Sequence, residues 1–414
     1  MLTQMGKKAK AAARVLSTAP ARLKNAALLG MADALVRESA SILQANQMDL
    51  EAGRAAGMTK SLLDRLSLSP GRIEGMADGL RQVAAFQDPI GKVDGGTIHP
   101  NGMQILKTRV PLGVVGMIYE ARPNVTADAA GLCLKSGNAV ILRGGKEAIH
   151  SNMAIASVMR EAIGETGLSK DSIQLVEDTT RASATAMMQL NGYLDVLIPR
   201  GGAGLIRAVV EHATVPVIET GVGNCHVYID FEADLEMAAQ IVCNAKTSRP
   251  SVCNACETLL VHKAVAEKAL PMVESLLSQH NVELRGCGVT RFILGDTVKE
   301  ATEEDYATEF SDYILAVKVV GSFQEAVDHI AQYSSGHSEC IVTRNYENAR
   351  RFTEQVDAAA VYVNASTRFT DGFEFGFGAE IGISTQKLHA RGPMGLEALT
   401  TTKYIIFGNG QIRK

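Results

Sequence analysis

Apolar positions along the chain change their spacing near residue 110, and this change separates regions of different predicted structure. Residues 1 to about 85 show helical spacing with a basic face. Leu28, Leu35 and Ile42 recur every seven residues there. We therefore expect these three side chains to lie on one continuous amphipathic helix that runs past Asp33.

From Val110 onward the apolar residues gather into short continuous runs, with helical stretches between them. The first runs predict buried strands over residues 113–119, 138–143, 173–176, 194–198 and 215–218. A second series begins near Val227, with strands predicted over residues 259–262, 314–320 and 338–342. Alternating strands and helices indicate parallel sheets with helices on their faces. The predicted fold class is therefore α/β, a type of architecture that often binds nucleotides but does not fix function by itself.

Two further segments predict antiparallel pairing. Residues 97–111 alternate around Asn101-Gly102, which is the strongest short signal for a hairpin. The run Thr400–Phe407 is rich in β-formers and ends at Gly408. Because a terminal strand has an unpaired edge, we expect it to pair with another subunit.

Composition narrows the class of protein. A chain of 414 residues exceeds a single compact core, which predicts two or three domains. The net charge of -4 gives no long-range attraction to nucleic acid or to anionic lipid. No apolar run approaches the ~18 residues that a membrane span requires. Seven irregularly spaced cysteines fit a reducing compartment, so a cytoplasmic enzyme is expected.

The N-terminal segment has a second interpretation. Residues 1–32 contain six basic residues and no acid, a composition similar to that of a mitochondrial transit peptide. Helical periodicity continues beyond this segment, however, which is expected of folded structure. We therefore expect the segment to be part of the fold.

One cysteine stands in a polar turn directly before an apolar run. Cys253 follows an Arg249-Pro pair, which favours extended backbone, and Lys246 and Arg249 are nearby cations that favour the reactive thiolate. Cys253 is therefore a candidate nucleophile. The alternatives are a small core cysteine, or a redox pair or half a zinc site formed with Cys256. Because no second pair of cysteines exists, no metal is expected.

A second turn has the character of an anion site. The dinucleotide fingerprint G-x-G-x-x-G is absent, but the predicted strand 138–143 ends in Arg143-Gly-Gly-Lys146 before a helix. Two cations beside glycines suit an extra phosphate, which favours NADP over NAD. Gly201 and Gly202 form a second place of close backbone approach. The alternative is a solvated surface loop.

Several segments in order along nearly the whole chain resemble the aldehyde dehydrogenase superfamily, and within it the branch of gamma-glutamyl phosphate reductases. The segments that carry the resemblance are residues 110–124, 141–147, 199–202, 219–226, 249–254, 337–339, 363–372 and 384–398. The resemblance implies two βα domains with Rossmann-like parallel sheets plus a β-flap for oligomerisation. The cofactor-binding domain would comprise residues 1–96 and 112–225, the catalytic domain 226–385, and the flap 97–111 and 395–414.

The resemblance also implies an activity and its partners. L-glutamate 5-phosphate would be reduced by NADPH to glutamate 5-semialdehyde and phosphate, on the route to proline, through a thioester on Cys253. The protein would be a homo-oligomer acting on a small molecule, and a glutamate 5-kinase would be a candidate for direct handover of the unstable substrate.

Site residues follow from the same resemblance. Glu219 matches the general-base position of oxidative members, and Glu309 the position that holds the nicotinamide ribose. The oxyanion position of ordinary members falls on Arg122, with Asn124 two residues on, so the Cys253 backbone N–H and the Asn254 amide are alternative donors.

Four residues are expected at the substrate, which carries charges of both signs: Arg249, Asn124, Arg368 for an anion and Asp371 for the ammonium. The alternative for the last two is that Arg368 and Asp371 pair with each other. Two other functions stay open: an aldehyde-oxidising dehydrogenase that works without phosphate, and a thiol switch built on Cys253 and Cys256.

Overall fold

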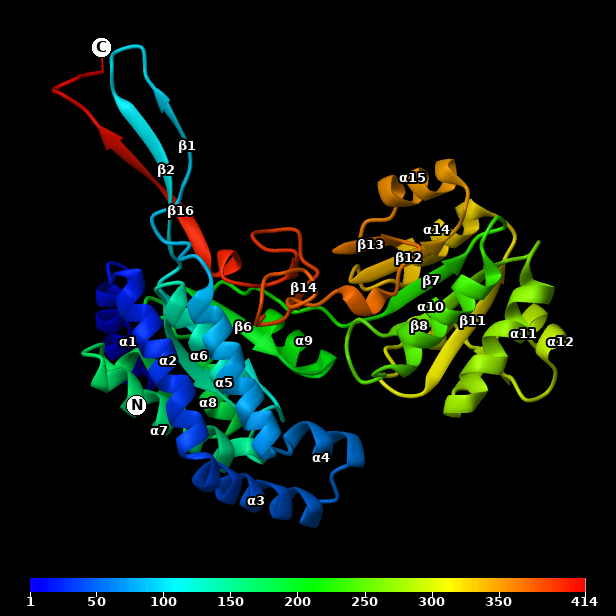
Figure 1. Cartoon of the computed structure of the whole chain (residues 1–414), viewed down its shortest axis with the longest axis horizontal. Helices are drawn as coiled ribbons and strands as arrows, with labels where there is room; N and C mark the ends of the chain where they lie inside the picture. Colours follow the sequence, from blue (N-terminus) through cyan, green and yellow to red (C-terminus); the bar gives the residue numbers. More distant parts are fainter. Residues whose placement is uncertain (414) are drawn as a thin grey trace. The chain divides into compact units, whose positions relative to one another are not determined.

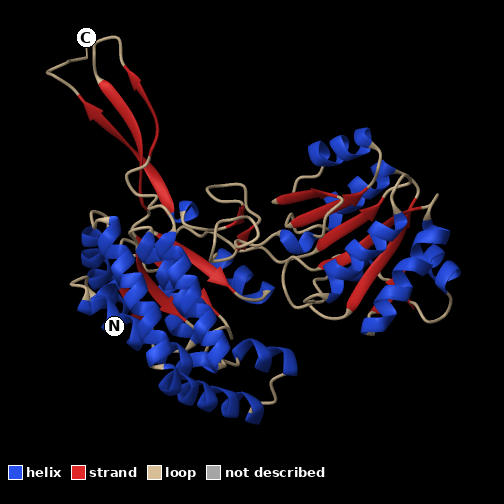
Figure 2. Ribbon diagram, in the orientation of Figure 1, coloured by secondary structure: helices blue, strands red, loops and turns tan. Residues whose placement is uncertain are grey.

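The computed structural model of the chain describes residues 1–413, and backbone contacts divide it into two units (Figures 1 and 2). The first unit comprises residues 1–220, 376–382 and the segment from 394 onward, and the second comprises 221–375 and 383–393. In the described residues no helix is both long and apolar enough to cross a bilayer.

Five helices precede the first sheet. Their bounds are α1 Leu2–Leu16, α2 Ala21–Arg37, α3 Ser39–Ala55, α4 Lys60–Leu66 and α5 Pro70–Ala85. The seven-residue repeat is buried as predicted, since Leu28, Leu35 and Ile42 are fully covered. A helix does run past Asp33, because α2 ends at Arg37, but the prediction that all three residues share it is wrong, since Ile42 lies on α3. Glu38 leaves helical geometry (φ -93°, ψ 16°), and the chain changes direction there between α2 and α3 (Figure 1).

A four-stranded parallel sheet in the order β5-β4-β3-β6 forms the centre of the first unit. Its strands are β3 Val114–Tyr119, β4 Ala139–Arg143, β5 Ile173–Leu175 and β6 Val196–Arg200, and its connecting helices are α6 Asn124–Lys135, α7 Ile149–Glu165, α8 Arg181–Met188 and α9 Ala203–His212. The strand predicted over 215–218 forms only one bridge, Leu197 to Val217. Pro216 accepts a hydrogen bond from the Leu197 N–H but has no N–H of its own, which stops a longer ladder.

The predicted hairpin and the C-terminal strand form one antiparallel sheet in the order β1-β2-β16, which we call the flap (Figure 2). Its strands are β1 Val93–Ile98, β2 Gln104–Pro111 and β16 Thr400–Phe407. Gly102 has φ +89°, a left-handed conformation that explains the glycine in this turn. Tyr404, Ile406 and Phe407 of β16 are exposed. The flap thus has an edge strand with uncovered apolar side chains.

The second unit is built on a seven-stranded sheet in the order β10-β9-β11-β8-β7-β12-β13, in which every recorded pair is parallel. Its strands are β7 Cys225–Ile229, β8 Cys256–His262, β9 Glu283–Gly286, β10 Lys299–Glu300, β11 Ile314–Val320, β12 Ser338–Val342 and β13 Ala360–Val363. Its helices are α10 Leu235–Thr247, α11 Ala266–Leu277, α12 Gly288–Leu294, α13 Glu303–Tyr306, α14 Phe323–Tyr333 and α15 Tyr346–Gln355. A small pair, β14 Ile383–Ser384 with β15 Gly392–Pro393, also belongs to it. The predicted α/β fold with two parallel sheets and a flap is confirmed.

Candidate active site

The candidate nucleophile lies in the turn between α10 and β8, in the second unit. Cys253 is half-buried. Cys256, three residues later, begins β8, carries a free thiol and is fully buried in the apolar core. Burial raises the pKa of the Cys256 thiol well above its usual range. The two cysteines of the C-x-x-C spacing therefore have different environments, and Cys256 has the character of a packing residue.

The backbone of Cys253 is packed against the segment that enters β7. A Cβ atom at Gly223 would lie 1.6 Å from the Cys253 carbonyl oxygen, so no other residue fits this position without movement of the backbone. The Cys225 thiol donates a hydrogen bond to the same oxygen at 3.2 Å. Residues about thirty positions earlier in the chain thus hold the nucleophile's main chain in place.

Asn254, which follows the nucleophile, uses its side chain to hold another loop. Its amide nitrogen donates to the carbonyl oxygens of Arg368 at 3.2 Å and Thr370 at 2.9 Å. Its amide oxygen accepts a hydrogen bond from the Arg368 guanidinium. Because an amide group has two N–H donors and both are used, the expectation that Asn254 donates to an oxyanion is not supported. The Cys253 backbone N–H stays the alternative donor.

Arg368 lies close enough to the nucleophile for charge to matter. It is half-buried, and its Nε donates to the Ser248 hydroxyl at 3.0 Å. Burial lowers the pKa of Arg368, Arg249 lowers it further, and Asp371 and the Cys253 thiolate oppose the shift. Arg368 therefore acts electrostatically on the thiol, where a cation favours the ionised form, and Arg249 acts on Arg368.

Arg368 and Asp371 do not form the ion pair that was the alternative for this loop. Among the residues that the structure describes, no ion pair within 4.0 Å joins them. The Asp371 carboxylate instead accepts a hydrogen bond from the Phe373 N–H at 2.9 Å within its own turn. Asp371 therefore acts on Arg368 through its charge but makes no direct ion pair with it.

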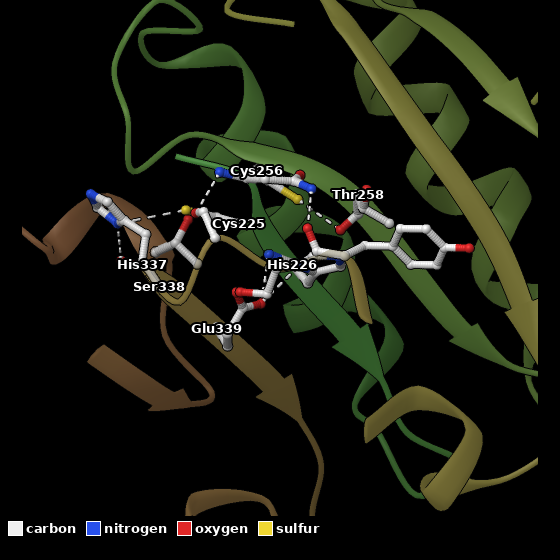
Figure 3. A network of polar contacts seen from close by, with 12 residues as sticks. Cys225, His226, Cys256, Thr258, His337, Ser338 and Glu339 are labelled. Carbon is white, nitrogen blue, oxygen red and sulfur yellow. Dashed lines mark hydrogen bonds and ion pairs between the residues drawn. The ribbon is translucent and has the colours of Figure 1, made fainter. Parts of the chain in front are cut away.

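A buried polar network joins residues of β7 and β12 and the segment just before β12 (Figure 3). Glu339 is fully buried and accepts hydrogen bonds from the His226 N–H at 2.9 Å and from the Ser334 hydroxyl at 2.5 Å. His337 Nδ1 lies 2.8 Å from the Ser338 hydroxyl and 3.7 Å from the Cys225 sulfur (Figure 3). The segment 337–339 therefore supports the site from within rather than contacting solvent.

A buried ion pair joins the two ends of the nucleophile's turn. Lys246, near the end of α10, contacts Glu257, near the start of β8, at 2.5 Å, and both side chains are fully buried. The second carboxylate oxygen of Glu257 accepts a hydrogen bond from the Ser311 N–H at 3.1 Å. Ser311 lies two residues after Glu309, so the ion pair also holds the loop of the residue expected at the nicotinamide ribose.

The two expected cofactor cations of the first unit differ in their contacts. Lys146 is exposed at the turn after β4. Arg143 donates from Nη2 to the carbonyl oxygens of Thr179 at 2.7 Å and Thr180 at 3.0 Å, so part of its donor capacity holds a loop. Its Nε is buried without an acceptor among the described residues. Lys146 is therefore open to solvent, whereas Arg143 is partly engaged within the unit, and their role at a cofactor stays a prediction.

Gly201 and Gly202 precede α9, and the carboxylate of Glu120 lies against their backbone. The Gly202 N–H donates to Glu120 Oε2 at 2.8 Å, and a Cβ atom at Gly201 would lie 2.5 Å from the same oxygen. This helix end thus accepts an anionic group, as its unpaired N–H groups and dipole favour. The ends of β4 and β6 flank β3, so Lys146 and this helix end belong to one edge of the sheet.

Two other expected residues also lie in the first unit. Asn124 is exposed at the start of α6 and donates to the Asp128 carboxylate at 2.9 Å. Burial raises the pKa of Asp128 to about 6, with Asn124 and Arg200 opposing the shift. Glu219 is half-buried in the segment after α9. Roles for Asn124 and Glu219 at the substrate and in proton transfer stay predictions.

Sequence reasoning missed the supporting residues of the site. Gly223, Cys225, Ser338 and Thr370 were not singled out, and neither was the pairing of Lys246 with Glu257. The one available signal was that polar residues interrupt segments otherwise expected to be buried, as Glu257 does at the start of the apolar run after Cys253.

Comparison with known proteins adds independent findings. The sequence model of the aldehyde dehydrogenase family matches residues 2–285 and 301–405 of this chain. The gamma-glutamyl phosphate reductase of Heliobacterium modesticaldum is 64% identical over 412 residues, covering 100% of this chain and 99% of that protein. That of Caldanaerobacter subterraneus is 60% identical over 408 residues, covering 99% and 98%. The crystal structure of the Thermotoga maritima gamma-glutamyl phosphate reductase superposes with a TM-score of 0.96 at 50% identity, with 100% of both chains covered.

The two βα units, the flap and a cysteine turn before a strand define the class of aldehyde dehydrogenases. Within that class the high identity over complete chains is decisive. The chain belongs to the gamma-glutamyl phosphate reductase branch of the aldehyde dehydrogenase family.

Proposed function

We propose that this protein reduces L-glutamate 5-phosphate to L-glutamate 5-semialdehyde and phosphate, the second step of proline biosynthesis from glutamate. The observation that carries the proposal is the Cys253 turn, with its backbone held by Gly223 and Cys225 and with the cation Arg368 acting on the thiol. Relatives that align over the whole chain and are named gamma-glutamyl phosphate reductase support the choice of substrate.

The chemistry needs a nucleophile that is also a leaving group, which a cysteine thiolate provides. The Cys253 thiolate attacks the acyl carbon, a C–S bond forms, and the C–O bond to phosphate breaks with phosphate leaving. When bound, a nicotinamide cofactor would supply the hydride for reduction of the thioester on Cys253. Collapse of the thiohemiacetal then breaks the C–S bond, returns the thiolate and releases the aldehyde. Because hydrolysis of the thioester would waste the phosphate, Glu219 is proposed to serve geometry or thiol deprotonation rather than to activate water.

The substrate is proposed to be held by its charges. Arg368 would bind the α-carboxylate through a bidentate contact, Arg249 would add positive charge, and Asp371 would meet the ammonium. Asn124 stays a proposed substrate contact from the first unit. Glu309 would hold the nicotinamide ribose, and its loop is tied to the nucleophile's turn through Glu257.

The test is the reverse reaction, which avoids the unstable acyl phosphate. NADPH formation from glutamate semialdehyde and NADP should require inorganic phosphate. The competing function, a dehydrogenase that oxidises aldehydes with water, predicts NADPH formation at the same rate with and without phosphate. That result would overturn the proposal.

NADP is proposed as the cofactor because an exposed lysine and an anion-accepting helix end lie at one edge of the first sheet. We expect Lys146→Ala to weaken NADPH binding at least tenfold while changing NADH binding less than twofold, since its charge-assisted contact goes only to the extra phosphate. Fluorescence titration with both cofactors measures this ratio. Arg143→Ala should also release the loop at Thr179, so a lower melting temperature is expected for that variant alone. Equal losses for both cofactors in Lys146→Ala would contradict the assignment.

The flap is proposed to mediate self-association. Deleting residues 401–414 removes the edge strand β16 with its exposed Tyr404, Ile406 and Phe407. We expect light scattering to give a smaller oligomer for this truncated chain, because the pairing edge is lost. A matched variant, Phe407→Lys with Ile406→Lys, keeps the strand and should also lower the mass. An unchanged mass in both would refute the assignment.

The setting of the reaction is proposed to be the cytoplasm, where a supply of reduced cofactor and a reducing environment suit an active cysteine. A glutamate 5-kinase must produce the substrate, and direct handover between the two enzymes would protect an acyl phosphate from water.

A further inference from the structure

We propose that Thr370 and Ser338 form a hydroxyl clamp that positions Arg368 relative to the Cys253 turn. The clamp goes beyond the proposed reaction because it assigns a role to buried hydroxyls that touch neither substrate nor cofactor. It rests on the proposed function only in that Arg368 binds a substrate anion.

The first observation is that Arg368 is held from the nucleophile's side of the site. Asn254 binds the guanidinium, the Arg368 carbonyl and the Thr370 carbonyl. In addition, the Asn254 carbonyl accepts a hydrogen bond from the Thr367 hydroxyl at 2.7 Å. Four contacts therefore join the residue after the nucleophile to the loop that carries Arg368.

The second observation is that the far end of this loop is fixed to the sheet by hydroxyl groups. Thr370 and Ser338 are fully buried, and their hydroxyl oxygens lie 2.6 Å apart. The Tyr362 hydroxyl, on β13, lies 2.7 Å from the same Thr370 oxygen. Burial raises the pKa of Tyr362 to about 12, so its hydroxyl keeps its proton at neutral pH. Thr370 thus ties the far end of the loop to β12 through Ser338 and to β13 through Tyr362.

The third observation closes a circuit back to the nucleophile. From Ser338 the contacts continue to His337 Nδ1 at 2.8 Å and then to the Cys225 sulfur at 3.7 Å (Figure 3). That thiol in turn donates to the Cys253 carbonyl at 3.2 Å. The Cys253 main chain is therefore supported by the same network that fixes Thr370. Moving one part of the circuit would shift the guanidinium and the sulfur relative to each other.

These contacts distinguish a positioning role from ordinary core packing. Thr370 is fully buried, and a valine at this position would fill nearly the same volume as threonine. What threonine adds is two hydroxyl contacts and hence a fixed orientation of the loop. Because buried hydroxyl contacts specify one arrangement, their loss should change geometry more than compactness.

The test compares Thr370→Val, which removes the hydroxyl, with Thr370→Ser, which keeps it, and with Thr353→Val, the same chemical change on the exposed face of α15. We expect Thr370→Val to raise the KM for glutamate semialdehyde at least tenfold with the KM for NADP unchanged. Thr370→Ser should stay within about threefold of the wild type. Thr353→Val should behave as the wild type.

A second readout does not depend on the substrate. The rate of Cys253 alkylation by anionic iodoacetate, divided by that for neutral iodoacetamide, reports positive charge beside the thiol. Arg368→Gln should lower this ratio several-fold, and Thr370→Val should lower it in the same direction, whereas Thr370→Ser should preserve it. Ser338→Ala provides an independent break of the clamp and should reproduce the effect.

A double variant decides whether the clamp acts through Arg368. If it does, Thr370→Val combined with Arg368→Gln should be no worse than Arg368→Gln alone in KM and in the alkylation ratio. Additive losses, or a Thr370→Val protein with a lower melting temperature but unchanged KM and ratio, would overturn the clamp. If the wild-type protein forms NADPH from glutamate semialdehyde equally well without phosphate, the proposed function is overturned, and the alkylation test stays valid.

Discussion

Cys253→Ala should reduce turnover below about one part in 10³ of the wild-type rate, because no other group in the site forms the thioester. The side chain is small and only half-buried, so the fold should be kept. NADPH titration and the melting temperature check that the variant binds cofactor and is folded. Measurable phosphate-dependent turnover in this variant would remove Cys253 from its role.

The matched control is Cys256→Ala, three residues away. Its thiol is buried in the core and donates to the Thr258 carbonyl at 3.3 Å, so we expect a loss of about 1 kcal/mol of stability with most of the activity kept. The thiol-switch alternative requires both cysteines to matter equally and a reversible disulfide between them. Equal behaviour of the two alanine variants would favour that alternative.

Much of the fold was predictable because fully buried parallel strands are continuous apolar runs. β3, β4, β11 and β12 were found within a residue or two of their ends for this reason. β9 and β10 were missed because they are short and polar, with Glu283, Arg285, Lys299 and Glu300 among their residues. These strands are defined by pairing, β9 with β11 and β10 with β9, which no local pattern records.

The candidate site was predictable at its nucleophile but not in its support. A cysteine in a polar turn before an apolar run is visible locally, and so is an arginine among glycines. The partners of Asn254 lie more than a hundred residues away, at Arg368 and Thr370, so its part in holding that loop appears only in the folded chain. For the same reason the engagement of Arg143 with the carbonyls at Thr179 and Thr180 could not be read from the motif.

The buried pair of Lys246 and Glu257 should give the largest change in stability. Lys246→Met removes the cation and leaves a carboxylate with no exposure, which is expected to cost about 3–5 kcal/mol at pH 8. Urea unfolding of the whole chain measures the loss. Because Lys246 and Glu257 flank the turn that carries Cys253, activity should fall together with stability. Cys253 should also be alkylated more slowly in Lys246→Met than in the wild type.

The loss should depend on pH in a defined direction. Burial raises the pKa of Glu257 to about 7, and Lys246 acts against that shift, so removing the cation should raise the value further. An unfolded glutamate titrates near ~4.3, and a folded-state pKa above that value means that folding favours the protonated form. Stability from this group is therefore present at low pH and lost as the pH rises through the folded pKa. The deficit of Lys246→Met should be largest near pH 8 and should shrink below about pH 7, where Glu257 is protonated.

A double variant separates the lost pair from lost packing. Lys246→Met combined with Glu257→Gln removes both charges and keeps an acceptor for the Ser311 N–H, so it should regain most of the stability and lose the pH dependence. Glu257→Gln alone leaves the lysine buried without its partner and should be nearly as unstable as Lys246→Met. If Lys246→Met costs less than about 1 kcal/mol, or if its deficit is the same at pH 6 and pH 8, the charged pair does not stabilise the turn.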